Sequence, residues 1–236
     1  MGKSIYKRIL LKISGEALSG SKDSGLDNET LLRIGKAVYD LTQMDVELAV
    51  VVGGGNFWRG RTSEGMDRVT ADHMGMLATT MNALALADAM DQAGCDTRVM
   101  SAIEMRQIAE TYIRKRALHH LEKGRVTVFA CGTGNPFFST DTAMALRAAE
   151  IDADIIFKAT NVDGVFDSDP KHNPNAIKYQ EVSHSEVLNK DLKVMDSNAA
   201  AICRDNHLKI IVFNLNDPQN IVKIAEGETN LGTLVY

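Results

Sequence analysis

Residues 46–56 read VELAVVVGGGN, a nearly continuous run of apolar and β-branched side chains that ends in three glycines and an asparagine. A strand that helices cover on both faces needs such an unbroken apolar run, because neither of its faces meets water. The pattern therefore predicts a buried strand of a parallel sheet, and the glycines mark the turn at its carboxyl end.

Strand-like and helix-like segments alternate on both sides of this run. Further strands are expected at residues 7–13, 97–100, 126–130, 154–159, 162–166, 209–213 and 233–235. Helices are expected at residues 31–41, 72–93, 103–121, 197–206 and 219–226, with one more directly after the segment CGTGNPFFSTDT. Such alternation predicts an α/β fold, a three-layer sandwich with a central, mostly parallel sheet and helices on both faces. With no repeat or linker in the sequence, we expect a single domain over residues 1–236.

Composition excludes several classes of protein. The net charge of −5 disfavours a nucleic-acid binder, which needs clustered Lys and Arg, but allows a small anionic ligand in a local cationic pocket. The sequence holds no run of 18 apolar residues that could span a membrane, and its first apolar stretch is too short for a signal peptide. The three cysteines show no CxxC spacing. We expect a cytoplasmic protein with reduced thiols and neither nucleic-acid nor membrane partners.

Three glycine-bearing loops follow expected strands: KISG at 12–15, GGGN at 53–56 and GTGN at 132–135. Ligands of open α/β sheets bind beyond the carboxyl ends of the strands, where glycine lets backbone N–H groups approach an anion. Each loop alone could be a plain turn, but three at one sheet edge indicate a phosphate-rich site. The sequence has no G-x-x-x-x-G-K-[ST], which argues against a P-loop kinase, and no G-x-G-x-x-G dinucleotide fingerprint after a strand.

Cations beside these loops are candidates for handling phosphate. Lys12 lies inside an apolar strand end, an unusual place for an unpaired ammonium, and we assign it a function. Arg59 follows the triple glycine and Lys158 ends the apolar run DIIFK, while Arg61 is interpreted as an ordinary solvated charge.

Three carboxylates lie near the starts of expected helices, and each has a structural alternative. Asp141, which follows Ser139 and Thr140, either takes part in catalysis or is a first-turn carboxylate that suits the helix dipole. Asp72 and Asp196 either bind a ligand or cap the helices that follow them. The Met- and Ala-rich run after Asp72 is interpreted as core packing.

Six longer motifs extend nearly from end to end. They are YKRILLKISGEAL, VVVGGGNFWRG, ADHMGMLATTMN, FACGTGNPFFSTDTA, KATNVDGVFDSDP and LKVMDS. In these motifs the chain resembles the bacterial uridylate kinases of the amino acid kinase superfamily. GGGN and Lys-x-Ser-Gly recur across the superfamily, whereas DHMGMLAT and TGNPFFSTD are more specific to the uridylate kinases. The resemblance implies an amino acid kinase-like fold and transfer of the γ-phosphate of ATP to UMP, which gives UDP and ADP in pyrimidine nucleotide biosynthesis.

Site residues follow from the same resemblance, position by position. Catalysis falls to Lys12, Arg59 and Asp141, with Asp196 near the transfer site. The implied ATP-binding residues are Lys12, Ile13, Ser14, Gly15, Gly55 and Arg59 at the phosphates and Thr160, Asn161, Phe166 and Asp169 at the nucleoside. The implied UMP-binding residues are Gly54, Asp72, Thr133, Gly134, Asn135, Pro136, Phe137, Phe138, Ser139 and Thr140. Phe166 stands where many members have Tyr, which keeps stacking on adenine but loses a phenol hydrogen bond.

Assembly and regulation are implied only by the family. The resemblance implies Mg²⁺ with ATP, a homo-hexamer, activation by GTP and inhibition by UTP, and it assigns no protein residue to a metal. The segment that aligns with a region tied to GTP activation is Gly20, Ser21, Lys22, Asp23, Ser24 and Gly25. Ala87 and Asp91 stand where some members have Arg and His, so the effector contacts of those members do not carry over directly.

Two other functions stay open. A sibling kinase that acts on a carboxylate or carbamate could share this fold, but Asp72 suits ribose hydroxyls and argues against it. A non-catalytic nucleotide sensor is the second alternative, and the presence of both Lys12 and Asp141 argues against it. The residues leave open how strictly UMP is preferred over CMP.

Overall fold

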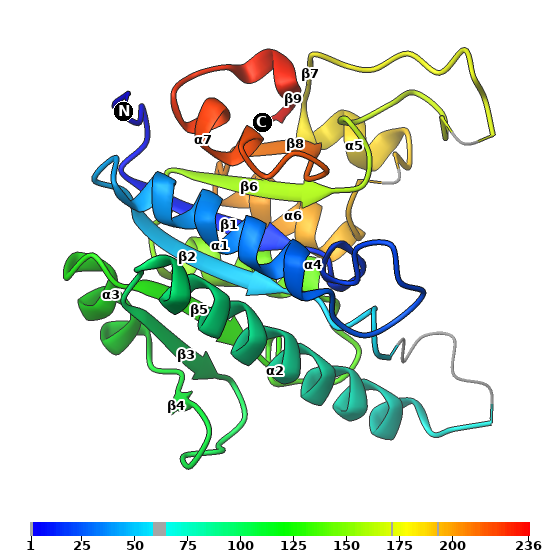
Figure 1. Ribbon diagram of the computed structural model, residues 1–236. Coiled ribbons are helices and arrows are strands. Elements are labelled where there is room, and N and C mark those ends of the chain that lie inside the picture. Colours follow the sequence, from blue (N-terminus) through cyan, green and yellow to red (C-terminus); the bar gives the residue numbers. More distant parts are fainter. Residues whose placement is uncertain (1, 59–64, 171, 193) are drawn as a thin grey trace.

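The computed structural model describes residues 2–58, 65–170, 172–192 and 194–236 (Figure 1). Arg59 and Arg61 lie outside the described residues. The strands are β1 (Arg8–Ile13), β2 (Glu47–Val52), β3 (Thr97–Ser101), β4 (Glu110–Thr111), β5 (Val126–Ala130), β6 (Ile155–Thr160), β7 (Glu181–Val182), β8 (Ile210–Asn214) and β9 (Gly232–Val235). The helices are α1 (Asn28–Thr42), α2 (Arg68–Ala93), α3 (Arg114–Glu122), α4 (Thr140–Glu150), α5 (His184–Asn189), α6 (Ser197–Asp205) and α7 (Asn220–Ala225), with 3₁₀ turns at Gly15–Leu18 and Thr229–Leu231.

All of these strands belong to one sheet in the order β4-β3-β5-β2-β1-β6-β8-β9-β7. The pairing is parallel except between β8 and β9, which run antiparallel. The prediction of an α/β fold with a mostly parallel sheet is therefore confirmed. β1 and β2 lie at the centre, which explains why their sequences are so uniformly apolar.

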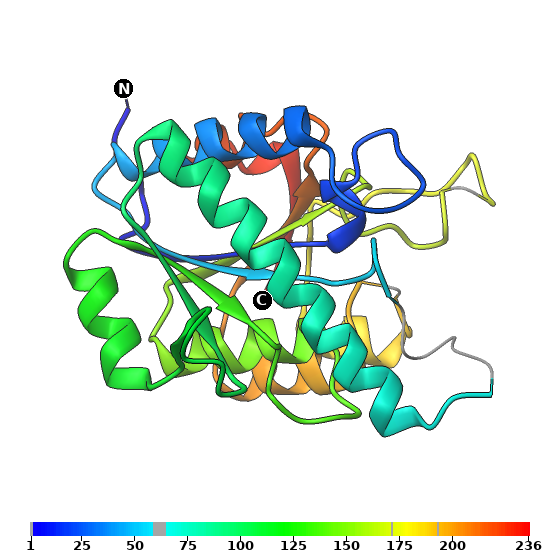
Figure 2. The same ribbon diagram turned by 60° about the horizontal axis from the view of Figure 1, so that its bottom comes forward.

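Helices cover both faces of the sheet and give three layers (Figure 2). Successive side chains of a strand point to opposite faces, so β1 serves two separate cores. Ile9, Leu11 and Ile13 pack with α1, α2 and α7, whereas Leu10 packs with α3, α4, α5 and α6. Lys12 alternates with its neighbours in the same way, and its side chain is therefore on the α4 face of the sheet.

Two predicted elements are wrong. The helix expected over 103–121 begins only at Arg114, because Tyr112 N–H donates to Ser101 O and joins the preceding segment to the end of β3. The strand expected over 162–166 is not formed, and only an isolated bridge joins Phe166 to Lys178. There Val165 N–H donates to the side-chain oxygen Thr233 Oγ1 at 2.9 Å, and Val165 O accepts from Tyr179 N at 2.8 Å. The short elements β4, β7 and α5 were not anticipated.

Two further properties bear on the class of protein. No helix within the described ranges is both long and apolar enough to cross a bilayer. Cys95, Cys131 and Cys203 are free thiols. Burial raises the pKa of Cys95 to about 11 and that of Cys203 to about 12, so these two thiols stay protonated and unreactive at neutral pH.

Candidate functional site

The three glycine loops meet at one edge of the sheet. They follow β1, β2 and β5, which are neighbouring parallel strands, so the carboxyl ends of the strands lie side by side. The first two loops touch through their backbones: a Cβ atom on Gly15 would lie 2.7 Å from Gly55 N, and one on Gly53 would lie 3.0 Å from Gly15 N. Only glycine allows this close approach, as the sequence predicted.

A buried pair of amides fixes the second loop. Asn82 of α2 is fully buried, and its Nδ2 donates to Gly53 O at 2.6 Å and to Asn56 Oδ1 at 2.7 Å. Asn56 Nδ2 donates back to Asn82 Oδ1 at 3.0 Å and also to Gly25 O at 2.7 Å. The loop thus has a satisfied polar anchor, and the exposed segment 20–25 is tied to it.

Two lysines and one aspartate form a buried charged cluster below the loops. Lys12 of β1 pairs in register with Lys158 of β6, and both side chains point to the α4 face. Lys12 Nζ is 2.8 Å from Asp141 Oδ1, and Lys158 Nζ donates to Asp141 Oδ2 at 2.6 Å. Lys12 is 7% exposed and Lys158 is 4% exposed, so neither is the solvated strand-end charge that the alternative interpretation required.

Charge within the cluster is set by burial and by the three partners. Burial alone would raise the pKa of Asp141, but the charges of Lys12 and Lys158 outweigh it and hold that pKa well below its usual range. Burial lowers the pKa of Lys158 to about 8, although Asp141 partly opposes this. Asp141 is therefore ionised at neutral pH and serves to hold the ammonium groups in place, with no proton affinity for base catalysis.

The start of α4 is held by a second carboxylate. Ser139 is the N-cap of α4, and its hydroxyl accepts from Asp141 N and Thr142 N at 3.0 and 3.1 Å. Asp196 caps α6 by accepting from Ala199 N, and it also accepts from the hydroxyls of Ser139 and Thr142. The capping interpretation of Asp196 is confirmed, and the same carboxylate joins the starts of two helices beside the cluster.

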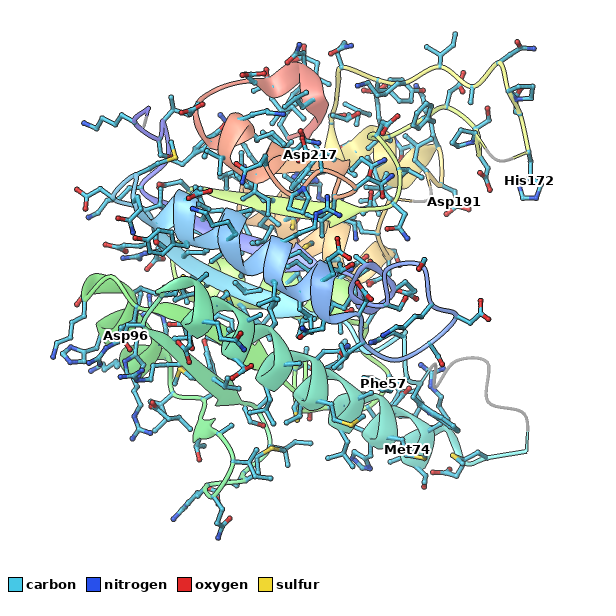
Figure 3. All side chains as sticks on the ribbon, viewed as in Figure 1. Phe57, Met74, Asp96, His172, Asp191 and Asp217 are labelled. Atoms are coloured by element: carbon cyan, nitrogen blue, oxygen red, sulfur yellow. The ribbon has the colours of Figure 1, made fainter. Side chains whose placement is uncertain are left out.

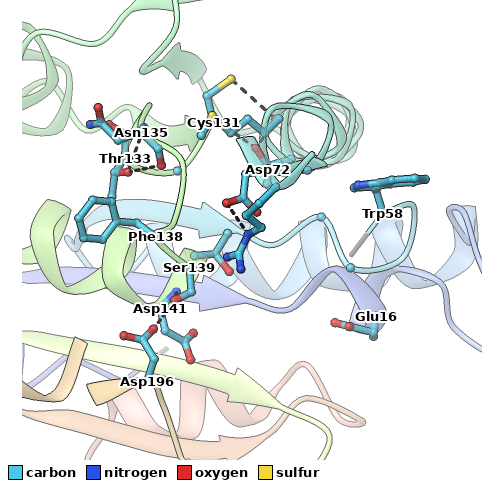
Figure 4. Close-up of a pocket in the computed structure, with 18 residues that line it drawn as sticks. Glu16, Trp58, Asp72, Cys131, Thr133, Asn135, Phe138, Ser139, Asp141 and Asp196 are labelled. Carbon is cyan, nitrogen blue, oxygen red and sulfur yellow. Dashed lines mark hydrogen bonds and ion pairs between the residues drawn. The ribbon is translucent and has the colours of Figure 1, made fainter. Parts of the chain in front are cut away.

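A first pocket of about 450 Å³ opens between the starts of α2 and α4 (Figure 4). Asp141 and Asp196 lie at its floor. Among the residues implied for UMP, its lining includes Gly54, Asp72, Thr133, Asn135, Phe138, Ser139 and Thr140. Gly134, Pro136 and Phe137 are outside the lining. Gly55, which the resemblance assigns to ATP, is within it. Gly132, from the predicted glycine loop, also lines the pocket. Lining residues that the sequence did not single out are Glu16, Trp58, Arg68, Gly75, Met76, Thr79 and Cys131.

Asp72 belongs to this pocket and does not cap a helix. α2 begins at Arg68, and its N-cap is Asp67, whose side chain accepts from Thr70 N. Asp72 Oδ2 instead accepts from Arg68 Nε at 2.9 Å and from Phe137 N at 2.8 Å. The carboxylate therefore joins α2 to the loop that follows β5, a contact between two segments of the implied UMP site.

A second pocket of about 480 Å³ lies on the other side of the cluster. Its lining includes Lys12, Ser14, Lys158, Thr160, Phe166 and Asp169. Ile13 is fully buried, so only its main chain could reach a ligand, while Asn161 lines a different cavity. Lys190, Asp191, Leu192 and Val194 also line this pocket. Leu192 and Val194 belong to the motif LKVMDS, but the sequence assigned none of the four to a ligand. Within the described residues, no three His, Cys, Asp or Glu side chains cluster to hold a metal ion.

Comparisons with known proteins agree with this geometry. Residues 7–214 match the model of the amino acid kinase family. The fold is similar to a UMP kinase from Bacillus anthracis, with a TM-score of 0.93 and 39% identity over 98% of this chain and 96% of the other. For a UMP kinase from Ureaplasma parvum the TM-score is 0.91, with 39% identity over 100% of this chain and 99% of the other. For a uridylate kinase from Archaeoglobus fulgidus the TM-score is 0.75, with 29% identity over 97% of this chain and 99% of the other.

Proposed function

This chain belongs to the amino acid kinase family, and we propose that it transfers the γ-phosphate of ATP to UMP to form ADP and UDP. One observation carries the proposal: two pockets meet at one buried charged cluster. Asp141 lines the first pocket, and its ion-pair partners Lys12 and Lys158 line the second. Phosphates bound in the two pockets would therefore approach each other at these three side chains. Two UMP kinases that share 39% identity over nearly their whole length support the choice of acceptor.

Phosphoryl transfer to UMP depends more on neutralisation of phosphate charge than on a general base. A phosphate monoester has a second pKa of about 6, so the UMP phosphate is mostly a dianion at neutral pH and is already a nucleophile. Bringing two phosphate charges to ~4 Å costs about 4 kcal/mol per charge pair at an effective dielectric near 20. Lys12 and Lys158 offset this repulsion and stabilise charge on the transferring oxygens. Asp141 keeps both ammonium groups in position.

We assign UMP to the first pocket and ATP to the second. Asp72 is proposed to accept a ribose hydroxyl, and Ser139 and Thr140 lie where the α4 N-terminus can meet the UMP phosphate. Phe166 lines the second pocket and is proposed to stack on adenine. The proposal keeps Arg59 as a further phosphate contact.

Mg²⁺ is proposed to arrive with ATP. The described residues build no cage for it, and both oxygens of Asp141 face lysine ammonium groups. Mg²⁺ commonly keeps water and substrate phosphate ligands with few protein groups. Phosphate oxygens and water are therefore its expected ligands, and its contribution is to neutralise phosphate charge.

Assembly, regulation and location are further parts of the proposal. Helix α2 exposes Met74, Leu77, Met81 and Leu84 along one face, and Met74 can be seen at the surface in Figure 3. Such an apolar face suits contact with further copies in a hexamer. GTP is proposed as activator, UTP as inhibitor, and the cytoplasm as location. Light scattering should give a mass well above 25.8 kDa, and a particle of that mass at working concentration would refute the hexamer.

A coupled assay of ADP release with UMP, CMP, AMP and N-acetylglutamate as acceptors tests the function. UMP should be phosphorylated far better than the others. If CMP or the amino acid works at least as well as UMP, the uridylate assignment is wrong. Binding of ATP and UMP without turnover would favour a nucleotide sensor.

A further inference from the structure

Arg147 of α4 is a buried cation outside the phosphate-handling cluster. The residue is 5% exposed. Its Nη1 donates to Glu150 Oε2 at 2.6 Å, and its guanidinium carbon lies 3.8 Å from the centre of the Tyr112 ring. Tyr112 Oη donates to the same Glu150 oxygen at 2.5 Å. A buried charge persists only with well-aligned partners, and here an ion pair and an aromatic face fix the orientation of the guanidinium.

The third contact of Arg147 points to the acceptor pocket. Its Nη2 donates to Gly132 O at 3.3 Å, and Gly132 lines the first pocket in the loop after β5. This loop has an unusual backbone, with φ values of 63° at Cys131, 57° at Gly132 and 80° at Gly134. A left-handed conformation at a non-glycine residue such as Cys131 persists only where its surroundings enforce it.

The opposite side of the same loop is held by α2. Cys131 N–H donates to Thr79 Oγ1 at 2.9 Å, and both residues line the pocket (Figure 4). Helices on the two faces of the sheet thus hold the loop between them, α2 through Thr79 and α4 through Arg147. The α2 side has further contacts, between Thr80 Oγ1 and Cys131 Sγ at 3.2 Å and from Phe137 N–H to Asp72 Oδ2 at 2.8 Å, whereas Arg147 holds Gly132 from the α4 side.

We propose that Arg147 is a positioning residue for the acceptor: through the Gly132 carbonyl it holds the loop after β5 in the conformation that binds UMP. The proposal rests on the proposed function for the identity of that acceptor. Arginine is required because its planar fork donates to Glu150 and Gly132 at the same time, whereas lysine presents one flexible ammonium. Tyr112 contributes by keeping the fork in plane.

Arg147→Lys should raise KM for UMP by about tenfold, because apparent affinity falls in proportion to the fraction of loop in the competent conformation. The values of kcat and KM for ATP should stay within about twofold, since Arg147 contacts neither Lys12 nor Asp141 nor Lys158. Equal rises in both KM values, or an unchanged KM for UMP, would overturn the proposal.

Arg8→Lys is the matched control. Arg8 is also a largely buried arginine with a glutamate partner, Glu47, and a main-chain acceptor, Ile151 O, but it lies at the amino end of β1, away from both pockets. Its replacement should lower thermal stability without changing KM for UMP. A similar rise in KM from Arg8→Lys would mean that any lost buried ion pair has this effect, and would contradict a positioning role.

Amide hydrogen exchange of residues 131–135 in the ligand-free protein gives a readout that does not depend on the acceptor. Exchange should be faster in Arg147→Lys and unchanged in Arg8→Lys; equal exchange in both would contradict the role. If Arg147→Lys fails to fold, Tyr112→Leu should raise KM for UMP by about threefold through the same loop, and no rise would count against the proposal. A wild-type protein inactive on UMP would contradict the proposed function, while the exchange comparison would still decide the role of Arg147.

Discussion

The two pockets that meet at Asp141 are built in different ways. The first is walled by glycine loops and by the starts of α2 and α4. The second is walled largely by residues within 160–170 and 190–192 and by Val194. Where main chain must approach an anion, glycine is required and leaves a signal in the sequence. Where loop side chains surround a nucleotide base, many residue types can make the contact, so the sequence carries no comparable signal.

The pockets also differ in how their walls are held. Buried polar groups anchor the first: Asn82 holds Gly53 and Arg147 holds Gly132. The loop near the second pocket projects from the body, with His172 near its tip (Figure 3), and its contacts are mostly exposed. Under the proposed assignment of UMP to the first pocket and ATP to the second, we expect acceptor choice to depend on rigid main chain and the donor pocket to adapt on binding.

Lys12→Ala should have the largest effect, because it removes one ammonium of the charged cluster at which the two pockets meet. We expect kcat to fall by on the order of 10²-fold or more, as the loss of a single contact to transition-state charge typically causes. Lys7→Ala is the control, since Lys7 is mostly exposed on the same segment and should leave kcat unchanged. A normal kcat in Lys12→Ala would exclude Lys12 from the mechanism.

Asp72→Asn should affect the acceptor pocket alone. The variant weakens a charge-assisted hydrogen bond to ribose and the contact to Phe137 N, and a loss of ~1.5–3 kcal/mol corresponds to a rise of about ten- to a hundredfold in KM for UMP. KM for ATP and kcat should change little. Asp88→Asn, on an exposed position of the same helix, is the control. Loss of thermal stability without a change in KM would make Asp72 a structural residue.

The dependence of kcat/KM on pH should report the ionisation of Lys158 in the charged cluster. With the pKa of Lys158 lowered to about 8 by burial, kcat/KM should fall about tenfold per unit above that pH as one cation is lost. Stability should change in the opposite direction: between about pH 8 and 10.5 the unfolded chain holds the Lys158 proton more tightly, so this residue's contribution to the free energy of unfolding rises with pH. Lys158→Arg should remove the alkaline fall in activity. A fall that persists in Lys158→Arg would assign it to another group.

The sequence predicted the features that follow from periodicity and from glycine. Continuous apolar runs located the central parallel strands, and the loops after them correctly predicted a shared edge. The failures have a common cause: at 103–121 and 162–166 tertiary hydrogen bonds override the local pattern, as the Val165 contact to Thr233 illustrates. Asn82 and Arg147 were missed because a buried polar residue on a helix looks like any exposed one until its partners are known.

A single bisubstrate molecule tests most directly whether the two pockets meet at Lys12, Asp141 and Lys158. The probe is a uridine joined to an adenosine through their 5′ oxygens by a chain of phosphates. Because linking two ligands makes the second binding event intramolecular, it should bind more tightly than either nucleotide. The account predicts one bound molecule per chain and inhibition that is competitive against both ATP and UMP. Inhibition that is competitive against only one of the two substrates would contradict it.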